Sequence, residues 1–273
     1  IQVTERESFM IVDFHTHIFP DSIAEKTISK LSGLIGQKPY TDATLKGLQQ
    51  SMKDAGVDYS VVLPVVTRPA QFETVNAYAV EVSKNPGILS FGGVHPKSES
   101  YRDEIDKIVE LGLKGIKLHP DFQDTFIEEP CYIDLIAYAL ERELIVTIHA
   151  GRDEGLPEPV HCPPDKTLYM IQEVQKRVST RKLILAHTGG HTMWDEVEEY
   201  LVGQDVYMDI SYSRSEIALE QMVRIMKTHR ADRILLGSDS PWDGQLETIQ
   251  FVKSLDITDE EKEFILGLNG ARL

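Results

Sequence analysis

The sequence predicts an α/β protein, a single-domain (β/α)₈ TIM barrel. Eight short apolar runs rich in Val, Ile and Leu alternate along the chain with eight segments of helical periodicity. Continuously apolar strands are typical of a parallel sheet covered by helices, and their alternation with helices excludes sandwiches and bundles. The chain has 273 residues, and α/β barrels of about 250 residues form one unit around one core.

These patterns place the elements in order along the chain. We predict strands over residues 10–17, 60–65, 88–95, 113–119, 144–150, 182–188, 206–212 and 234–240. We predict helices over residues 41–55, 72–84, 101–111, 132–142, 166–178, 193–202, 217–229 and 246–255. In the third helix Ile105, Ile108 and Val109 share one stripe, as expected of a helix that packs on a barrel. A doubly wound open sheet is the alternative, but it predicts a phosphate turn of G-x-G-x-x-G spacing, which the sequence lacks.

The remaining segments are expected to be a tail and two long loops. Residues 1–9 are polar and charged, so we predict an N-terminal tail there and the barrel domain over residues 10–273. Residues 18–40 and 151–164 are expected to form loops over the mouth of the barrel, where substrate specificity would lie.

Composition excludes several classes of partner. Lys and Arg number 28 against 44 Asp and Glu, and the net charge of −16 would repel nucleic acid and anionic membranes. No apolar run reaches the ~18 residues that span a bilayer. Two cysteines, Cys131 and Cys162, are too few for a disulfide framework, which favours a reducing cytoplasm.

Histidines gather where a barrel would carry its active site. Functional side chains of this fold lie at the carboxyl ends of the strands, and packing gives histidine no reason to prefer one end. The strand-end residues are His15 and His17 on the first strand, His95, His119, His149 and His187 on the third to sixth, and Asp239 on the eighth. Because side chains alternate along a strand, His15 and His17 project to the same side, about 6 to 7 Å apart.

We therefore expect a metal site. His15, His17, His149 and Asp239 would bind one divalent cation, most simply Zn²⁺, with Mn²⁺, Fe²⁺ or Co²⁺ possible for the same ligands. The cation would lower the pKa of a bound water toward about 7. Asp239 could also accept the proton of that water, and His187 would orient the water or polarise a substrate oxygen.

Four further residues are candidates for substrate binding. Lys117 and His119 lie two apart on the fourth strand and so share a face, while Arg68 and Arg152 follow the second and fifth strands. The basic groups could pair with a substrate carboxylate. Alternatively, His119 is a corner residue before Pro120, and the arginines are solvated surface groups.

Five motifs in order resemble one known family. They are Asp13-Phe-His-Thr-His17, Gly115-Ile-Lys-Leu-His-Pro120, Thr147-Ile-His-Ala150, Ala186-His-Thr-Gly-Gly190 and Gly237-Ser-Asp-Ser-Pro-Trp242. The chain resembles the amidohydrolase superfamily, in its amidohydrolase-related branch of metal-dependent TIM-barrel hydrolases, over nearly its whole length. The resemblance implies a mononuclear or binuclear metal site with His15, His17, His149, His187 and Asp239 in the family's positions. Binuclear relatives bridge two metals through a carboxylated lysine or a glutamate on strand four, where this chain has Lys117; we expect a single metal.

The function expected is hydrolysis of a small-molecule amide, ester or lactone. The alternative is a lyase, a decarboxylase or hydratase of an unsaturated or aromatic carboxylic acid, which relatives in this branch perform with the same ligands. A non-catalytic metal-binding barrel is disfavoured by the acid/base pair of His187 and Asp239. A phosphoesterase is opposed by the acidity of the chain and by the absence of a strand-four glutamate. The partner is a small molecule, and homo-oligomers are possible.

Overall fold

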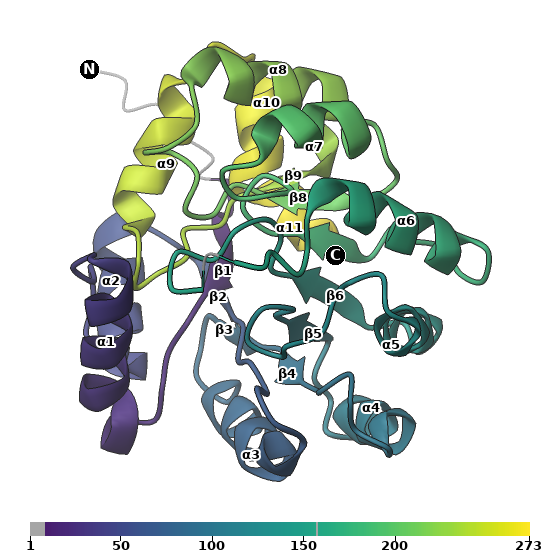
Figure 1. Ribbon diagram of the computed structural model, residues 1–273. Helices are drawn as coiled ribbons and strands as arrows, with labels where there is room; N and C mark the ends of the chain where they lie inside the picture. Colours follow the sequence, from purple (N-terminus) through teal and green to yellow (C-terminus); the bar gives the residue numbers. More distant parts are fainter. Residues whose placement is uncertain (1–8, 157) are drawn as a thin grey trace.

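The computed structural model describes residues 9–156 and 158–273. Residues 1–8 of the predicted tail therefore lie outside the described residues. Parallel strands form a central ring, and helices surround it (Figure 1). The predicted TIM barrel is confirmed.

The strands follow one another around the ring in chain order. They pair in parallel as two sheets, β1-β2-β3 and β4 to β9. Their bounds are β1 Val12–Thr16, β2 Tyr59–Val62, β3 Ile88–Ser90, β4 Gly92–Gly93, β5 Gly115–Leu118, β6 Ile145–Ile148, β7 Leu183–Leu185, β8 Tyr207–Asp209 and β9 Ile234–Leu235. All eight predicted strands are present, and the third is divided into β3 and β4 at Phe91.

Asn76 explains the division of the third strand. This buried side chain on α3 (Phe72–Val82) exchanges two hydrogen bonds with Gly93: the Gly93 amide donates to Oδ1 over 3.0 Å, and Nδ2 donates to the Gly93 carbonyl over 2.9 Å. A helix side chain thus takes a pairing role that a neighbouring strand usually has. The ring is continuous across the break, because the Phe91 amide donates to the Val62 carbonyl over 2.9 Å.

The first and last strands close the ring. The Phe14 amide donates to the Leu236 carbonyl over 2.8 Å, and the Asp239 amide donates to the His15 carbonyl over 2.8 Å. These bonds run beyond the end of β9, so the segment that carries Asp239 lies beside the segment that carries His15.

The eight predicted helices are present as α2 to α9 with small shifts at their ends, and α1, α10 and α11 were not predicted. Their bounds are α1 Asp21–Ile35, α2 Leu45–Ala55, α3 Phe72–Val82, α4 Tyr101–Glu110, α5 Pro130–Glu141, α6 Pro164–Gln175, α7 Trp194–Tyr200, α8 Leu219–His229, α9 Gln245–Ser254, α10 Asp259–Glu263 and α11 Asn269–Arg272, with short turns at Pro69–Gln71, Ala231–Arg233 and Phe264–Leu268. Ile105 and Ile108 are fully buried, as the stripe on α4 predicts. Within the described residues, no helix combines the length and apolarity needed to cross a membrane.

One predicted loop is wrong. Residues 18–40 contain the 15-residue helix α1, which ends at Gly36 in a left-handed conformation. The helix buries only Ala24 and Ile28, while Ile23 and Leu34 are exposed. Ala24, Ile28, Leu31 and Ile35 nevertheless recur at helical spacing, so the sequence carried a helix signal that the predicted loop left out.

An irregularity in β1 sets which of its side chains face inward. The register between β1 and β2 shifts between Asp13 and Thr16. Phe14 joins an apolar layer inside the ring, where its ring meets Phe91 edge-on at 5.9 Å. His15, the next residue, is also buried and contacts Lys117 of β5. Such an irregularity changes the direction in which side chains point. Here it places the polar side chain of His15, with Lys117 beside it, above the apolar layer that contains Phe14.

Candidate metal centre

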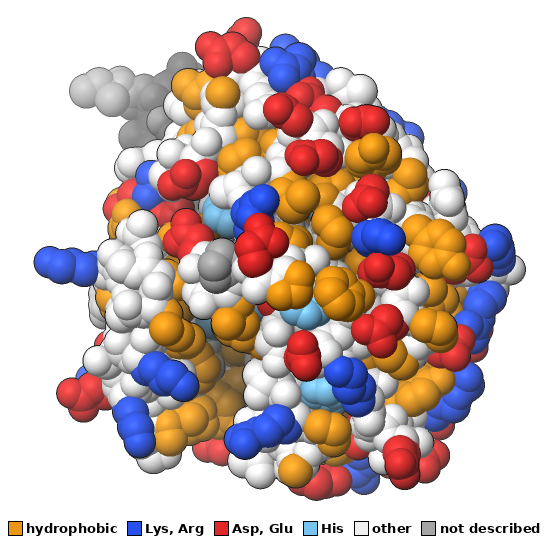
Figure 2. All heavy atoms as spheres, viewed as in Figure 1, with side chains coloured by type: hydrophobic (Ala, Val, Ile, Leu, Met, Phe, Trp, Pro, Cys, Tyr) orange, Lys and Arg blue, Asp and Glu red, His pale blue; other side chains and the backbone are white. Residues whose placement is uncertain are grey.

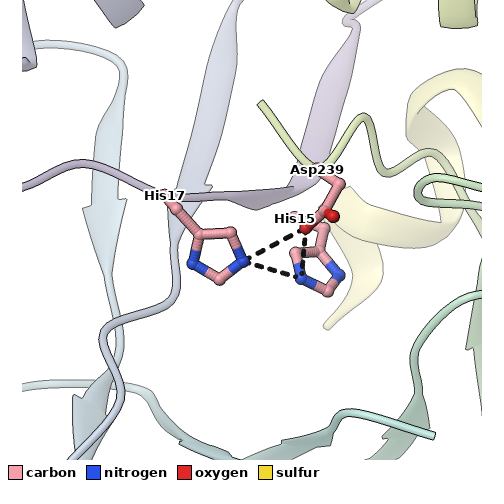
Figure 3. Close-up of side chains that lie close together, drawn as sticks. All are labelled: His15, His17 and Asp239. Atoms are coloured by element: carbon pink, nitrogen blue, oxygen red, sulfur yellow. Dashed lines mark hydrogen bonds and ion pairs between the residues drawn. The ribbon is translucent and has the colours of Figure 1, made fainter. Parts of the chain in front are cut away.

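His15, His17 and Asp239 converge at the carboxyl ends of the first and last strands (Figure 3). The Nε2 atoms of the two histidines lie 3.2 Å apart, and each lies 3.1 Å from Oδ1 of Asp239. His15 is completely buried, while the side chain of His17 is 19% exposed and that of Asp239 is 10% exposed. The group is thus open to solvent from one side only.

Hydrogen bonds behind the rings fix which nitrogen carries a proton. Nδ1 of His17 lies 2.9 Å from the carbonyl of Leu63, which can only accept, so His17 carries its proton on Nδ1. Nδ1 of His15 lies 2.9 Å from Oδ2 of Asp209, which assigns its proton in the same way. Burial and the charge of Lys117 hold the pKa of His15 well below its ordinary value, so the ring is neutral. Both Nε2 atoms therefore present lone pairs.

Three hydrogen-bond acceptor atoms that face one another indicate a site for a cation. Two imidazole lone pairs and a carboxylate oxygen repel each other unless a positive charge lies among them. Their mutual distances of 3.1 to 3.2 Å fall between the roughly 2.8 to 3.1 Å that separate neighbouring ligands of an octahedral ion and the roughly 3.3 to 3.6 Å of a tetrahedral one, for ligands about 2.0 to 2.2 Å from the ion. These residues fit a divalent metal.

Lys117 adds a buried ammonium group beside the cluster. Its Nζ lies 3.1 Å from Nε2 of His15, and the residue is 1% exposed. Burial lowers the pKa of Lys117 to about 8, although Asp209 and Asp239 oppose that shift. Burial also raises the pKa of Asp239, but the adjacent His15 and His17 outweigh this effect and hold the pKa below its ordinary value. Asp239 is therefore a carboxylate at neutral pH.

His187 and His149 form a pair beside this cluster. Nε2 of His187 lies 2.9 Å from Nδ1 of His149, and the rings of His187 and His15 are centred 5.2 Å apart. Burial lowers the pKa of His187 to about 4, so His187 is neutral. Its Nδ1 lies 3.1 Å from the Ser211 carbonyl, which places its proton there and leaves a lone pair on Nε2.

His149 does not lie within the compact group of His15, His17 and Asp239. It belongs to a second group with His119 and Asp153. His119 follows β5, and His149 and Asp153 follow β6. The rings of His119 and His149 stack at 4.0 Å, and Nε2 of His119 lies 3.4 Å from Oδ2 of Asp153. Nε2 of His149 is buried and has no hydrogen-bond partner among the described residues. Its role as a metal ligand stays a prediction.

Asp209 and Ser211 are residues that the sequence analysis did not select. Asp209 is fully buried at the end of β8 and receives Nδ1–H of His15. The Ser211 hydroxyl lies 3.0 Å from Nδ1 of both His15 and His187 and donates to Asp209. The sequence did offer a signal for Asp209, because it is a carboxylate in the predicted strand 206–212, which also ends at the mouth of the barrel.

Left-handed backbone marks several of these strand ends. His187 has φ 58° and Asp239 has φ 67°, and Tyr212 after β8 has φ 48°. Non-glycine residues rarely adopt this conformation, and it concentrates at functional sites. The surrounding hydrogen bonds hold it: the Thr188 amide donates to the Asp209 carbonyl over 2.6 Å, and the Trp242 amide donates to the Asp239 carbonyl over 2.8 Å.

The two candidate arginines lie on the surface. Arg68 is exposed at the start of the turn Pro69–Gln71. Arg152 is also exposed and pairs with Glu158. Neither contacts the histidine cluster among the interactions of the described residues, and their role in substrate binding stays a prediction.

The cluster lies at one end of the barrel, and an apolar groove lies at the other. Figure 2 shows the surface in the view of Figure 1, with a hollow between the side chains of α1 and α3; this hollow is not the apolar groove, which no residue of α1 lines. The groove has a volume of about 530 Å³ and is lined by early strand residues such as Val12, Tyr59 and Ile145. It lacks acid/base groups like those at the strand ends, so the histidine cluster is the better candidate for chemistry.

The ring of strands and the histidine–aspartate cluster together define a TIM-barrel enzyme of the metal-dependent class. The family model described as Amidohydrolase matches residues 12–273. The chain therefore belongs to the amidohydrolase family and is an enzyme, as the motifs indicate. Both the family and the cluster support a divalent metal.

Solved structures of the same fold cover nearly the whole chain. One is the 5-carboxyvanillate decarboxylase from Sphingomonas paucimobilis, with a TM-score of 0.68, 16% identity, and 97% of this chain and 98% of that chain covered. Another is a 2,6-dihydroxybenzoate decarboxylase complexed with 2,6-dihydroxybenzoate, with a TM-score of 0.69, 13% identity and coverage of 97% and 98%.

A third structure contains a metal. It is the 5-carboxyvanillate decarboxylase from Novosphingobium aromaticivorans with manganese and 4-hydroxy-3-methoxy-5-nitrobenzoic acid, with a TM-score of 0.69, 13% identity, and 98% of this chain and 96% of that chain covered. At these identities the likeness shows the fold. No curated protein matches the sequence.

Proposed function

We propose that this protein is a metal-dependent decarboxylase of an aromatic or unsaturated carboxylic acid. The observation that carries the proposal is the acceptor cluster of His15, His17 and Asp239 with the Lys117 ammonium 3.1 Å from His15. A divalent cation and a lysine side by side would suit a carboxylate and a neighbouring oxygen of one substrate. The similar structures that act on carboxylated aromatic rings favour this reaction over hydrolysis, which the motifs alone favour.

The reaction needs charge stabilisation and one proton. The bond between the ring carbon and the carboxylate breaks, CO₂ leaves, and the electron pair stays on the carbon until a proton arrives. A bound divalent cation would act as a Lewis acid that stabilises negative charge on the substrate. Lys117 would hold the carboxylate end of the substrate. Nε2 of the neutral His187 would release its bond to Nδ1 of His149, take a proton from solvent and return it to the carbon.

Three side chains would hold the cation directly. His15 and His17 would bind through Nε2 and Asp239 through its carboxylate. His149 is the fourth ligand proposed from the sequence; its Nε2 is the unpartnered atom, and its Nδ1 faces His187. An imidazole ligand usually gives its other N–H to a neighbour, which fits this arrangement. We propose Zn²⁺ as the native metal and Mn²⁺ as the main competitor.

Hydrolysis of an amide or ester is the second candidate. The neutral His187 and the carboxylate of Asp239 are both acceptors, so either could take the proton of an attacking water. The predicted cytoplasmic location and an oligomeric assembly stay proposals beside either reaction.

The test is a product analysis after metal analysis. Purified protein is assayed for metal content and loaded in parallel with Zn²⁺ and Mn²⁺. Each form is then incubated with hydroxybenzoates, carboxylated phenols, muconate-like acids, lactones and N-acyl compounds. Release of CO₂ with formation of the protonated ring supports the proposal. Uptake of water at a lactone or amide bond without CO₂ release would transfer the assignment to a hydrolase.

A further inference from the structure

His191 is a buried histidine whose two ring nitrogens have no hydrogen-bond partner among the described residues. The residue is only 2% exposed. The nearest charged atom is Oε1 of Glu154, 3.7 Å from Nε2, which is beyond hydrogen-bonding distance. Leaving a buried polar group without a hydrogen bond destabilises the folded state, so an imidazole with two such nitrogens indicates a partner that binds there.

The backbone holds His191 in a fixed place beside the metal centre. Its amide donates to the Ala150 carbonyl over 2.8 Å, and its carbonyl accepts from the Arg152 amide over 3.1 Å. A side chain at Gly151 would overlap the backbone of His191, so only glycine permits this approach. The rings of His191 and His187 are centred 6.0 Å apart.

Two further side chains complete a polar group around this ring. Tyr212 lies with its ring centred 5.5 Å from that of His191, and its hydroxyl donates to Oε2 of Glu154 over 3.1 Å. The Tyr212 proton is therefore already used, and Oε1 of Glu154 remains an acceptor near Nε2 of His191. Burial lowers the pKa of His191, so its ring offers one donor and one acceptor. Acceptors outnumber donors in this group.

We propose that His191, with Glu154 and Tyr212, forms a subsite for a hydroxyl or amino group of the substrate. We call these three residues the His191 subsite. Such a group donates to the free imidazole nitrogen or to the Glu154 carboxylate and accepts from the imidazole N–H. The inference rests on the proposed function, because it assigns the polar substituent of the carboxylic acid whose carboxylate binds near Lys117.

The test compares the binding of matched ligands to metal-loaded protein. Dissociation constants are measured by calorimetry for benzoate, the three isomeric hydroxybenzoates and the three isomeric aminobenzoates. The variants are His191→Phe, which keeps a ring but removes both nitrogens, and His191→Gln, which restores a donor and an acceptor. Glu154→Gln keeps an acceptor but removes the charge. Circular dichroism and metal content establish that each variant is folded and loaded.

We expect at least one substituted isomer to bind wild type 10-fold or more tightly than benzoate. This ratio should fall to near one in His191→Phe and partly recover in His191→Gln. The affinity for benzoate itself should be the same in both variants as in wild type. Glu154→Gln should weaken the binding of both substituents, because an O–H or N–H donor then loses a charged acceptor. A ratio that is the same in wild type and His191→Phe would overturn the subsite.

Failure of the proposed function has a different signature. If neither benzoate nor any isomer binds to metal-loaded wild type or variants, the substrate class is wrong and the subsite falls with it. If benzoate binds but no substituent improves its affinity, the substrate class stands and the His191 subsite alone is refuted.

Discussion

The protonation of individual side chains decides what this centre can do. His15 and His17 carry their protons on Nδ1, toward Asp209 and Leu63, so both lone pairs point to Asp239. His187 likewise carries its proton on Nδ1, because this atom faces the Ser211 carbonyl. Metal binding and proton transfer are therefore assigned to different residues, and single substitutions should separate them.

Replacing His187 should impair catalysis without loss of metal. We expect His187→Asn to retain metal near the wild-type content while kcat falls 10²-fold or more, the range for loss of an acid/base group. His15→Ala should instead lose the metal, because it removes one of three converging ligands. Metal content and steady-state kinetics measure both effects. If His187→Asn loses its metal to the same extent as His15→Ala, this division of roles is wrong.

Asp209 should act on the metal through His15. Asp209→Asn removes the charge that holds the proton on Nδ1 of His15, so we expect metal affinity to fall 10- to 100-fold in competition with a chelating dye. Asp243→Asn is the matched control, since that carboxylate pairs with Arg214 rather than with a histidine. Equal affinities for Asp209→Asn and wild type would contradict the positioning role.

At the scale of single residues, the sequence predicts which side chains converge better than it predicts their surroundings. Strand alternation correctly indicates that His15 and His17 share a face, and parallel-strand topology indicates that Asp239 ends beside them. His149 lies in a neighbouring group because its ring stacks on His119, a side-chain contact that spacing does not specify. Asp209 was missed because it acts behind His15 and lies outside the five motifs, although its strand also ends at the mouth of the barrel.

Secondary-structure elements show where close packing constrains the sequence. The turn Phe264–Leu268 packs on β1, and a side chain at Gly267 would overlap the carbonyl oxygen of Met10. Gly33 lies within α1 and has no atom within 4 Å of the position of an added Cβ. These two glycines form a matched pair.

Alanine substitutions at these two glycines should change the free energy of unfolding in opposite directions. Gly267→Ala should lower the free energy of unfolding by about 1 to 3 kcal/mol or more, because the backbone of Met10 has to move. Gly33→Ala should raise it by about 0.5 to 1 kcal/mol, because alanine favours a helix interior. Urea unfolding in the metal-free state measures both changes. A destabilised Gly33→Ala variant or an unaffected Gly267→Ala variant would show that the packing described here is wrong.

The elements were largely predictable, and the exceptions have physical causes. Periodicity gives the eight strands and their helices because a barrel strand is buried on both faces and an outer helix on one. The third strand is divided because the side chain of Asn76 bonds to Gly93, a contact between distant residues. The helix α1 buries only two side chains, but Ala24, Ile28, Leu31 and Ile35 share one stripe, so its sequence allowed a helix prediction.

The pH dependence of the free energy of unfolding is a property of the whole molecule, and His229 makes one contribution that can be measured separately. Nδ1 of this buried residue accepts the Gly203 amide over 3.1 Å, and Nε2 donates to the Val206 carbonyl over 3.0 Å, so a second proton has no place. Burial lowers the pKa of His229 below 6.5. As pH falls below 6.5, the unfolded chain takes up a proton that the folded chain does not, and the folded state loses stability.

His229→Gln should reduce this pH dependence while keeping a donor for Val206. We expect the free energy of unfolding of wild type to fall more steeply between about pH 6.5 and pH 5 than that of the variant, by up to about 1.4 kcal/mol per pH unit. Urea titrations of both proteins with chelator present measure the two slopes, and the variant is expected to be less stable at about pH 7.5. Identical slopes would exclude His229 as a contributor.

The closure of the ring between β1 and the segment after β9 has a consequence for biosynthesis. Residues 15 and 17 leave the ribosome well before residue 239, yet all three meet at one point. A nascent chain therefore displays two histidines long before their carboxylate partner exists. High-affinity metal capture becomes a late event of maturation, and fragments truncated before residue 239 lack a complete centre.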